Sequence, residues 1–130
     1  MNKELVRQWV EALRSGKYKQ GRLSLRDIND KFCCLGVLCD IAKGNLNLDW
    51  RLGTSEDICY EIEDTTTVVP ESILEFLGVN IHKAFINAGD LRYDLGIPSN
   101  ESKMSLIDLN DYYKVSFNEI ADIIEEEFLK

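Results

Sequence analysis

Apolar residues recur at helical spacing near both ends of the chain. Between residues 3 and 14 charged residues separate them, which predicts an amphipathic helix on Leu5, Val6, Trp9, Val10 and Leu13. Gly16 is the expected C-terminal cap. Ser116 and Glu119 predict a capping box, followed by an apolar helix face of Phe117, Ile120, Ala121, Ile124 and Phe128. We expect this last helix to dock on the core and to show an acidic face to solvent or a partner: Glu119, Asp122, Glu125, Glu126 and Glu127.

The middle of the chain predicts a buried helix and a small sheet. Residues 34–43 are nearly apolar on all sides and end at Gly44, which favours a short buried helix, although a buried strand over residues 32–38 fits the same periodicity. Between residues 48 and 69, β-branched and aromatic residues alternate with polar ones, and residues 65–69 are expected to pair with the alternating positions Ile58, Tyr60 and Ile62.

Shorter signals complete the predicted architecture. Pro70, at a first-turn position, and Gly78 bracket a short amphipathic helix. Residues 15–30 are expected to be mostly loop, and residues 79–103 show no decisive pattern. The chain is therefore predicted to form one α+β domain over residues 1–130, with helices at both ends and a short central helix packed on a small antiparallel sheet.

Length and composition agree with one intracellular domain. A chain of 130 residues with 45% hydrophobic residues suffices for a single core. No segment approaches the roughly 18 apolar residues that a membrane span needs, and the N-terminal residues lack the apolar run of a signal peptide. We therefore expect no membrane partner.

The four cysteines are expected to be free thiols in a reducing compartment. Cys33, Cys34 and Cys39 alternate with aliphatic residues and lack the paired spacing of a zinc site, and His82 is the single histidine. No metal site or cofactor is expected. Because His82 has no neighbouring motif and the thiols lie in an apolar run, no catalytic residues are assigned and the chain is not expected to be an enzyme.

Charge divides the chain into a basic start and an acidic remainder. Residues 1–31 carry eight basic and four acidic side chains, a balance of +4, whereas the remaining 99 residues carry seven and nineteen, a balance of −12. A local positive field on an acidic body favours a compact anionic ligand and disfavours nucleic acid. A helix-turn-helix reading of the last helix is disfavoured because that helix is acidic. The basic residues also fit a simpler role, pairing with the acidic remainder on folding.

The loop after the first helix is the predicted ligand site. It combines cations, glycines, an aromatic ring and an amide, which together can hold a phosphate and a base. Its spacing is not that of a phosphate-binding loop or a dinucleotide fingerprint. Outlying candidates are Arg26, an exposed aromatic at Trp50, and a ribose- or base-contacting pair, Asn110 and Asp111. The predicted loop residues are Arg14, Ser15, Gly16, Lys17, Tyr18, Gln20, Gly21 and Arg22. An ordinary solvated loop, and a simple turn at 110–111, remain the alternatives.

Four segments resemble a family of small tailed-bacteriophage proteins. They are WVEALRSGKYKQG and FCCLGVLCDIA near the N-terminus, LND at residues 109–111, and SFNEIADIIE near the end. The resemblance covers about the first 40 and last 25 residues, and this chain departs from the pattern with RLSLRD at residues 22–27. It implies phage origin and a host cytoplasm but no particular activity.

Two functions remain open for a phage accessory protein. The first is a non-catalytic sponge that sequesters a small anionic nucleotide signal, such as the cyclic ADP-ribose isomers of Thoeris or the cyclic oligonucleotides of CBASS. A sponge of this type gains from homo-oligomerisation, because symmetric pockets form between subunits. The second is an acidic interaction protein that binds and blocks a host protein.

Overall fold

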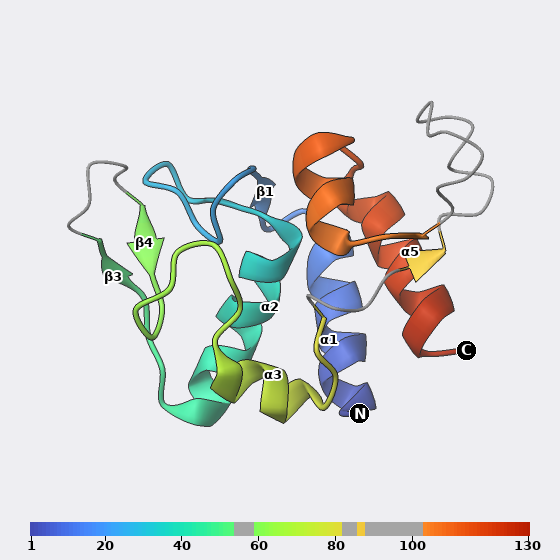
Figure 1. Ribbon diagram of the computed structural model, residues 1–130, viewed down its shortest axis with the longest axis horizontal. Helices are drawn as coiled ribbons and strands as arrows, with labels where there is room; N and C mark the ends of the chain where they lie inside the picture. Colours follow the sequence, from blue (N-terminus) through green and yellow to red (C-terminus); the bar gives the residue numbers. More distant parts are fainter. Residues whose placement is uncertain (54–58, 82–85, 88–102) are drawn as a thin grey trace.

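The computed structural model describes residues 1–53, 59–81, 86–87 and 103–130 (Figure 1). The helices and strands run in the order α1 Lys3–Arg14, β1 Lys19–Gln20, β2 Lys31–Phe32, α2 Cys34–Ala42, the 3-10 turn η1 Lys43–Leu46, β3 Arg51–Leu52, β4 Tyr60–Glu61, α3 Glu71–Leu77, β5 Ile86–Asn87, β6 Lys103–Met104, the π-helical turn η2 Asp108–Tyr112 and α5 Phe117–Phe128. The predicted α+β class is confirmed. No helix in these ranges is long and apolar enough to cross a bilayer.

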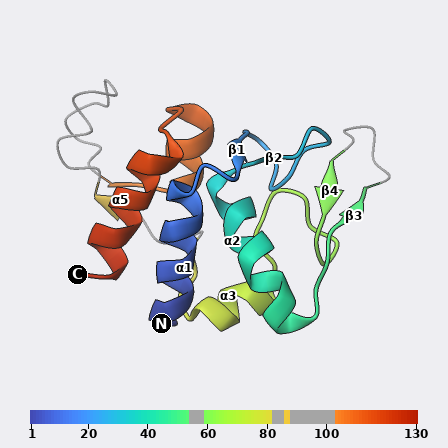
Figure 2. The same cartoon turned by 180° about the vertical axis from the view of Figure 1, so that it is seen from behind.

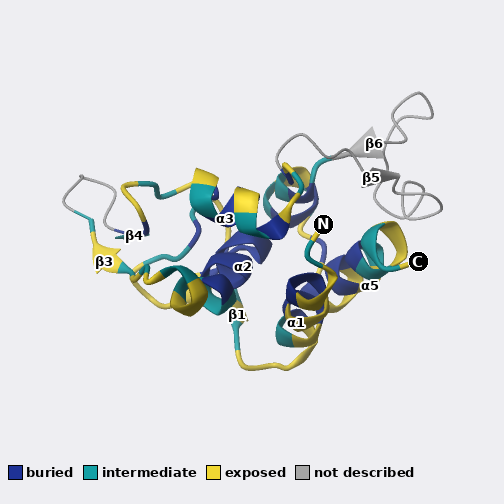
Figure 3. Cartoon of the chain, turned by 90° about the horizontal axis from the view of Figure 1, so that it is seen from below, coloured by how far each residue is buried: buried dark blue, intermediate teal, exposed yellow. Residues whose placement is uncertain are grey.

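The two terminal helices pack side by side, and α2 packs against α1 (Figures 1 and 2). Figure 3 shows α2 as the most buried helix and exposed outer faces on α1 and α5. All five predicted apolar positions of α1 are buried, and the indole Nε1 of Trp9 donates to the Cys34 carbonyl at 2.9 Å. The core therefore lies between these three helices.

The first helix spans the predicted residues, and the last helix begins at the predicted capping box. The side chain of Asn2 accepts from the Leu5 amide at 3.0 Å, and Gly16 follows α1 with φ +75°. At α5, Ser116 Oγ accepts from the Glu119 amide at 3.2 Å. Phe128 at the end of α5 is half-buried. The other four predicted apolar positions of this helix are buried: Phe117, Ile120, Ala121 and Ile124.

The central apolar segment forms the predicted helix and not the alternative strand. Cys33 is the N-cap of α2, and its Sγ accepts from the Gly36 amide at 3.4 Å. Only Lys31 and Phe32, just before the helix, are extended as β2. Further on, Pro70 is the N-cap of α3 and lies outside the helix that it was expected to open, while Gly78 ends it with φ +81°.

The strands form separate two-stranded pairs and not one sheet. β3 pairs antiparallel with β4 in the register Arg51 to Glu61, so the partner of Tyr60 is Leu52 and not a residue of the expected segment 65–69. β1 pairs in parallel with β2, and β5 pairs antiparallel with β6. The expected pairing of residues 65–69 reduces to one bridge between Ile62 and Thr65, and Ile58 lies outside the described residues.

Candidate functional site

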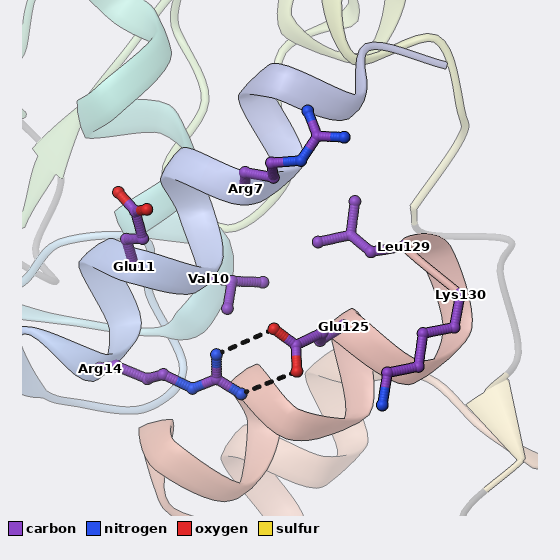
Figure 4. A pocket seen from close by; sticks show the side chains of 7 residues that line it. All are labelled: Arg7, Val10, Glu11, Arg14, Glu125, Leu129 and Lys130. Atoms are coloured by element: carbon purple, nitrogen blue, oxygen red, sulfur yellow. Dashed lines mark hydrogen bonds and ion pairs between the residues drawn. The ribbon is translucent and has the colours of Figure 1, made fainter.

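An open groove of about 510 Å³ lies between α1 and α5 (Figure 4). One wall comes from α1, where Val10 and Glu11 each lie three or four residues from both Arg7 and Arg14, so the four positions share a helix face. The other wall comes from the end of α5. The groove is lined by Arg7, Val10, Glu11, Arg14, Glu125, Leu129 and Lys130.

Arg14 joins the two walls. Its NH1 lies 3.1 Å from Glu125 Oε2, and its NH2 lies 2.6 Å from Asp122 Oδ1. The hydrogen bonds that Arg14 donates lower the pKa of Glu125, and the carboxylates of Glu125 and Asp122 that accept them raise the pKa of Arg14. Two carboxylates of the predicted acidic face are therefore occupied within the molecule.

The lowered pKa of Glu125 predicts an acid-dependent loss of stability. Because Glu125 binds its proton less tightly in the folded than in the unfolded chain, the Arg14–Glu125 pair stabilises fully above the ordinary carboxyl pKa of about 4.3. We expect Glu125→Gln to lower the free energy of unfolding at pH 7, and the difference from wild type to vanish as the pH falls through the lowered pKa.

Urea unfolding across pH measures this difference. In an Arg14→Met background, Glu125→Gln should change the free energy of unfolding little, both at pH 7 and at acidic pH, because the partner of Glu125 is gone. An effect of Glu125→Gln that persists in this background would contradict the assignment to Arg14.

The other two cations of the groove also have carboxylate neighbours outside it. Arg7 NH1 lies 3.4 Å from Glu4 Oε2, and Lys130 Nζ lies 3.3 Å from Glu126 Oε2. All four side chains are more than half exposed, so these pairs contribute little to stability. Both cations therefore remain accessible to a bound anion.

Three residues of the predicted loop lie beside the groove. Ser15, Lys17 and Tyr18 line a depression of about 390 Å³ that shares Glu11 with it. The Tyr18 hydroxyl donates to Asp40 Oδ2 at 2.6 Å, and burial together with this bond raises the pKa of Tyr18. The Tyr18 ring packs edge-on against Phe32 with centroids 5.0 Å apart, so it is anchored to the protein.

Gln20, Gly21 and Asn110 are bonded within the fold. Asn110 is 1% exposed, and its Oδ1 accepts from Gln20 Nε2 at 2.9 Å and from the Cys34 amide at 3.2 Å. Its Nδ2 donates to the Gly21 carbonyl at 2.9 Å and to Asp111 Oδ1 at 2.7 Å. These bonds use the amide of Asn110 to connect segments that are distant in the sequence. Asn110 itself lies in the π-helical turn η2, which agrees with the alternative of a turn at 110–111.

Arg26 and Trp50 meet in an aromatic cluster elsewhere on the surface. The Arg26 guanidinium carbon lies 3.9 Å from the centroid of Tyr60, and its NH2 lies 2.7 Å from Asp30 Oδ1. Trp50 is half-buried, not exposed as expected, and its Nε1 donates to Asp40 at 2.9 Å. Arg22 is exposed and lines neither the groove nor the depression.

The structure thus divides the predicted site. Arg14 lines the groove and part of the loop lies beside it, whereas Gln20, Gly21 and Asn110 hold the fold together. Sequence reasoning missed Arg7, Glu11, Leu129 and Lys130 as groove residues. The spacing of Arg7, Glu11 and Arg14 on one helix was an available signal, but nothing local indicated that the end of α5 would lie opposite.

Burial keeps the thiols of Cys33, Cys34 and Cys39 protonated at neutral pH. All four cysteines are buried and none of them forms a disulfide bond, which confirms the prediction that they pack as reduced thiols. Burial raises the pKa of Cys33 to about 11 and that of Cys34 further above its ordinary value. Within the described residues no three potential ligands gather for a metal ion.

The fold and the groove define a small α+β protein with an open, charged cleft between its terminal helices. The chain belongs to the family described as a domain of unknown function (DUF8296), whose model matches residues 1–128. No match was found among curated proteins or among solved structures.

Proposed function

We propose that this chain is a phage accessory protein that binds and sequesters a small anionic nucleotide signal in the groove between α1 and α5, without catalysis. The observation that carries the proposal is the chemistry of the groove: three cations line it beside two carboxylates and two apolar side chains, in a volume typical of small-molecule sites. Sequestration in the host cytoplasm would inhibit antiviral immunity that depends on a cyclic ADP-ribose isomer or a cyclic oligonucleotide.

Each part of the groove suits one part of a nucleotide. Arg7 and Lys130 supply charged donors for phosphate oxygens, and half-buried Leu129 offers apolar surface to a base or a ribose face. Glu11 supplies an acceptor for ribose hydroxyls, the role that carboxylates take in dinucleotide sites. A mixed groove of this kind supports binding of a nucleotide over inorganic phosphate.

A titration with cyclic ADP-ribose isomers and cyclic dinucleotides at low salt tests the proposal. One ligand should raise the Tm by several degrees, since a ligand at 100 times its Kd stabilises the folded state by about 2.7 kcal/mol. Arg7→Ala and Lys130→Ala should each weaken binding by about tenfold or more, because a charged hydrogen bond contributes about 1.5–3 kcal/mol.

The matched control is Arg51→Ala. Arg51 is an exposed arginine on β3 that pairs with Glu61 and Asp64, away from the groove, so its removal should leave the Kd unchanged. Lys17→Ala reports on the depression beside the groove. Weakening by Lys17→Ala alone would move the site to the loop, and no binding by any nucleotide would overturn the proposal.

The second candidate is an acidic protein that blocks a host protein. It is favoured because many positive charges are neutralised by carboxylates of the same chain, which leaves the acidic surface dominant. The basic side chains that form such ion pairs in the described part of the chain are Arg7, Arg14, Arg26, Lys43, Arg51 and Lys130. Exposed Glu127, beyond these pairs, adds to the acidic surface. Binding by this surface should weaken steeply with salt and on Glu126→Gln with Glu127→Gln.

A further inference from the structure

A second pocket, of about 180 Å³, opens beside the N-terminal end of α2. Its wall includes Leu23, Cys33, Val68 and Ile107, and it shares no lining residue with the groove between α1 and α5. Leu23 is 76% exposed and Val68 is 48% exposed, so apolar surface faces solvent at its mouth. Exposed apolar surface around a cavity marks an interaction site.

Leu23 is held in an unusual backbone conformation. Its φ is +70°, in the left-handed region that disfavours residues with a Cβ. The loop that presents it is bonded on both sides, by the Gly21 amide to the Phe32 carbonyl at 2.7 Å and by the Leu25 amide to the Thr66 carbonyl at 2.8 Å. The exposed leucine is therefore a preorganised projection, and strain of this kind gathers at functional positions.

We propose that this surface is a two-fold interface between two copies of the chain, in which Leu23 of each copy enters the pocket of the other. A projection and a cavity on the same patch are self-complementary, which is the requirement of an isologous dimer. The pocket volume suits an aliphatic side chain, since an apolar cavity of roughly 150 Å³ holds a benzene molecule.

Charge on the same patch supports a second copy as the occupant. Arg22, adjacent to Leu23, is exposed and makes no ion pair among the described residues. Asp111 is half-buried in the pocket wall. When Leu23 of one copy enters the pocket of the other, its neighbour Arg22 is carried toward Asp111 of the opposite copy, and symmetry repeats the contact.

Sedimentation equilibrium over a range of concentrations tests the interface. The wild type should dimerise, and Leu23→Asn should raise the dimer Kd at least about 100-fold, because two leucines lose their apolar burial. Asn tolerates a positive φ, so the dissociated variant should unfold at a Tm no lower than that of dissociated wild type. If Leu23 had only a structural role, Leu23→Asn would lower the Tm of the dissociated protein as well as weaken the dimer.

Matched changes identify the surface. Leu52→Asn replaces another exposed leucine, on β3 and outside the pocket, and should leave the Kd unchanged. Arg22→Glu should weaken the dimer, and Asp111→Lys in the same chain should restore much of the loss. A wild type that stays monomeric throughout, or a dimer that Leu23→Asn leaves intact, would overturn the proposal.

Discussion

Asn110→Ala is expected to lower the free energy of unfolding by about 3–5 kcal/mol. The substitution removes both polar atoms of a buried amide and leaves the Cys34 amide and the Gly21 carbonyl without this partner. Each buried polar group that loses its hydrogen bond costs about 1–3 kcal/mol, and Gln20 loses one of its bonds as well. Urea unfolding followed by tryptophan fluorescence measures the change, since Trp9 is buried against the Cys34 carbonyl.

Asn118→Ala is the matched control for this prediction. Asn118 is exposed near the start of α5, and its replacement should alter stability by no more than about 0.5 kcal/mol. If Asn110→Ala cost as little as Asn118→Ala, the hydrogen bonds of Asn110 would not hold these segments together.

Gly36→Ala is expected to destabilise the fold by more than about 3 kcal/mol. A Cβ at this position would lie 1.8 Å from the Leu25 carbonyl oxygen, so the helix and the preceding loop would have to separate. Overpacking typically costs about 1–3 kcal/mol where side chains can move, and here the obstacle is backbone. The loss should appear as a lower midpoint of urea unfolding or as failure to fold.

Gly44→Ala is the matched control. It shows whether the loss of stability in Gly36→Ala comes from the clash with the Leu25 carbonyl or from replacing any glycine by alanine. Gly44 has nothing within 4 Å of an added Cβ, so alanine there should be neutral or slightly stabilising through the unfolded state. Equal losses at both positions would contradict the proposed close approach of α2 to Leu25.

The helices could be predicted from the sequence because their signals are local. The apolar spacing of residues 5–13, the caps at Ser116 and Gly78, and the apolar run after Cys33 each depend on neighbours within four positions, and each helix forms within a residue of its predicted place. The sheet was predicted less well, because pairs of two residues carry too little alternation to specify a partner. The parallel pairing of β1 with β2 had no sequence signal.

The predicted binding residues separated because residue type does not specify a partner. A basic loop fits a ligand site and an intramolecular contact equally well, and only the packing of α1 on α5 brings Arg14 to Asp122, which lies 108 residues away. The same packing sets Lys130 across the groove from Arg7 (Figure 4).

The sequence by itself determined the three main helices, their buried faces and the buried thiols, because hydrophobic periodicity states which side of a helix must leave water. Only the tertiary structure decided which polar groups meet. It turned Asn110 from a candidate ligand contact into a buried junction and moved the strongest candidate site from a loop to the groove between α1 and α5. The physical reason is that burial is encoded along the chain, whereas hydrogen bonds and ion pairs between distant residues depend on where the packed helices place them.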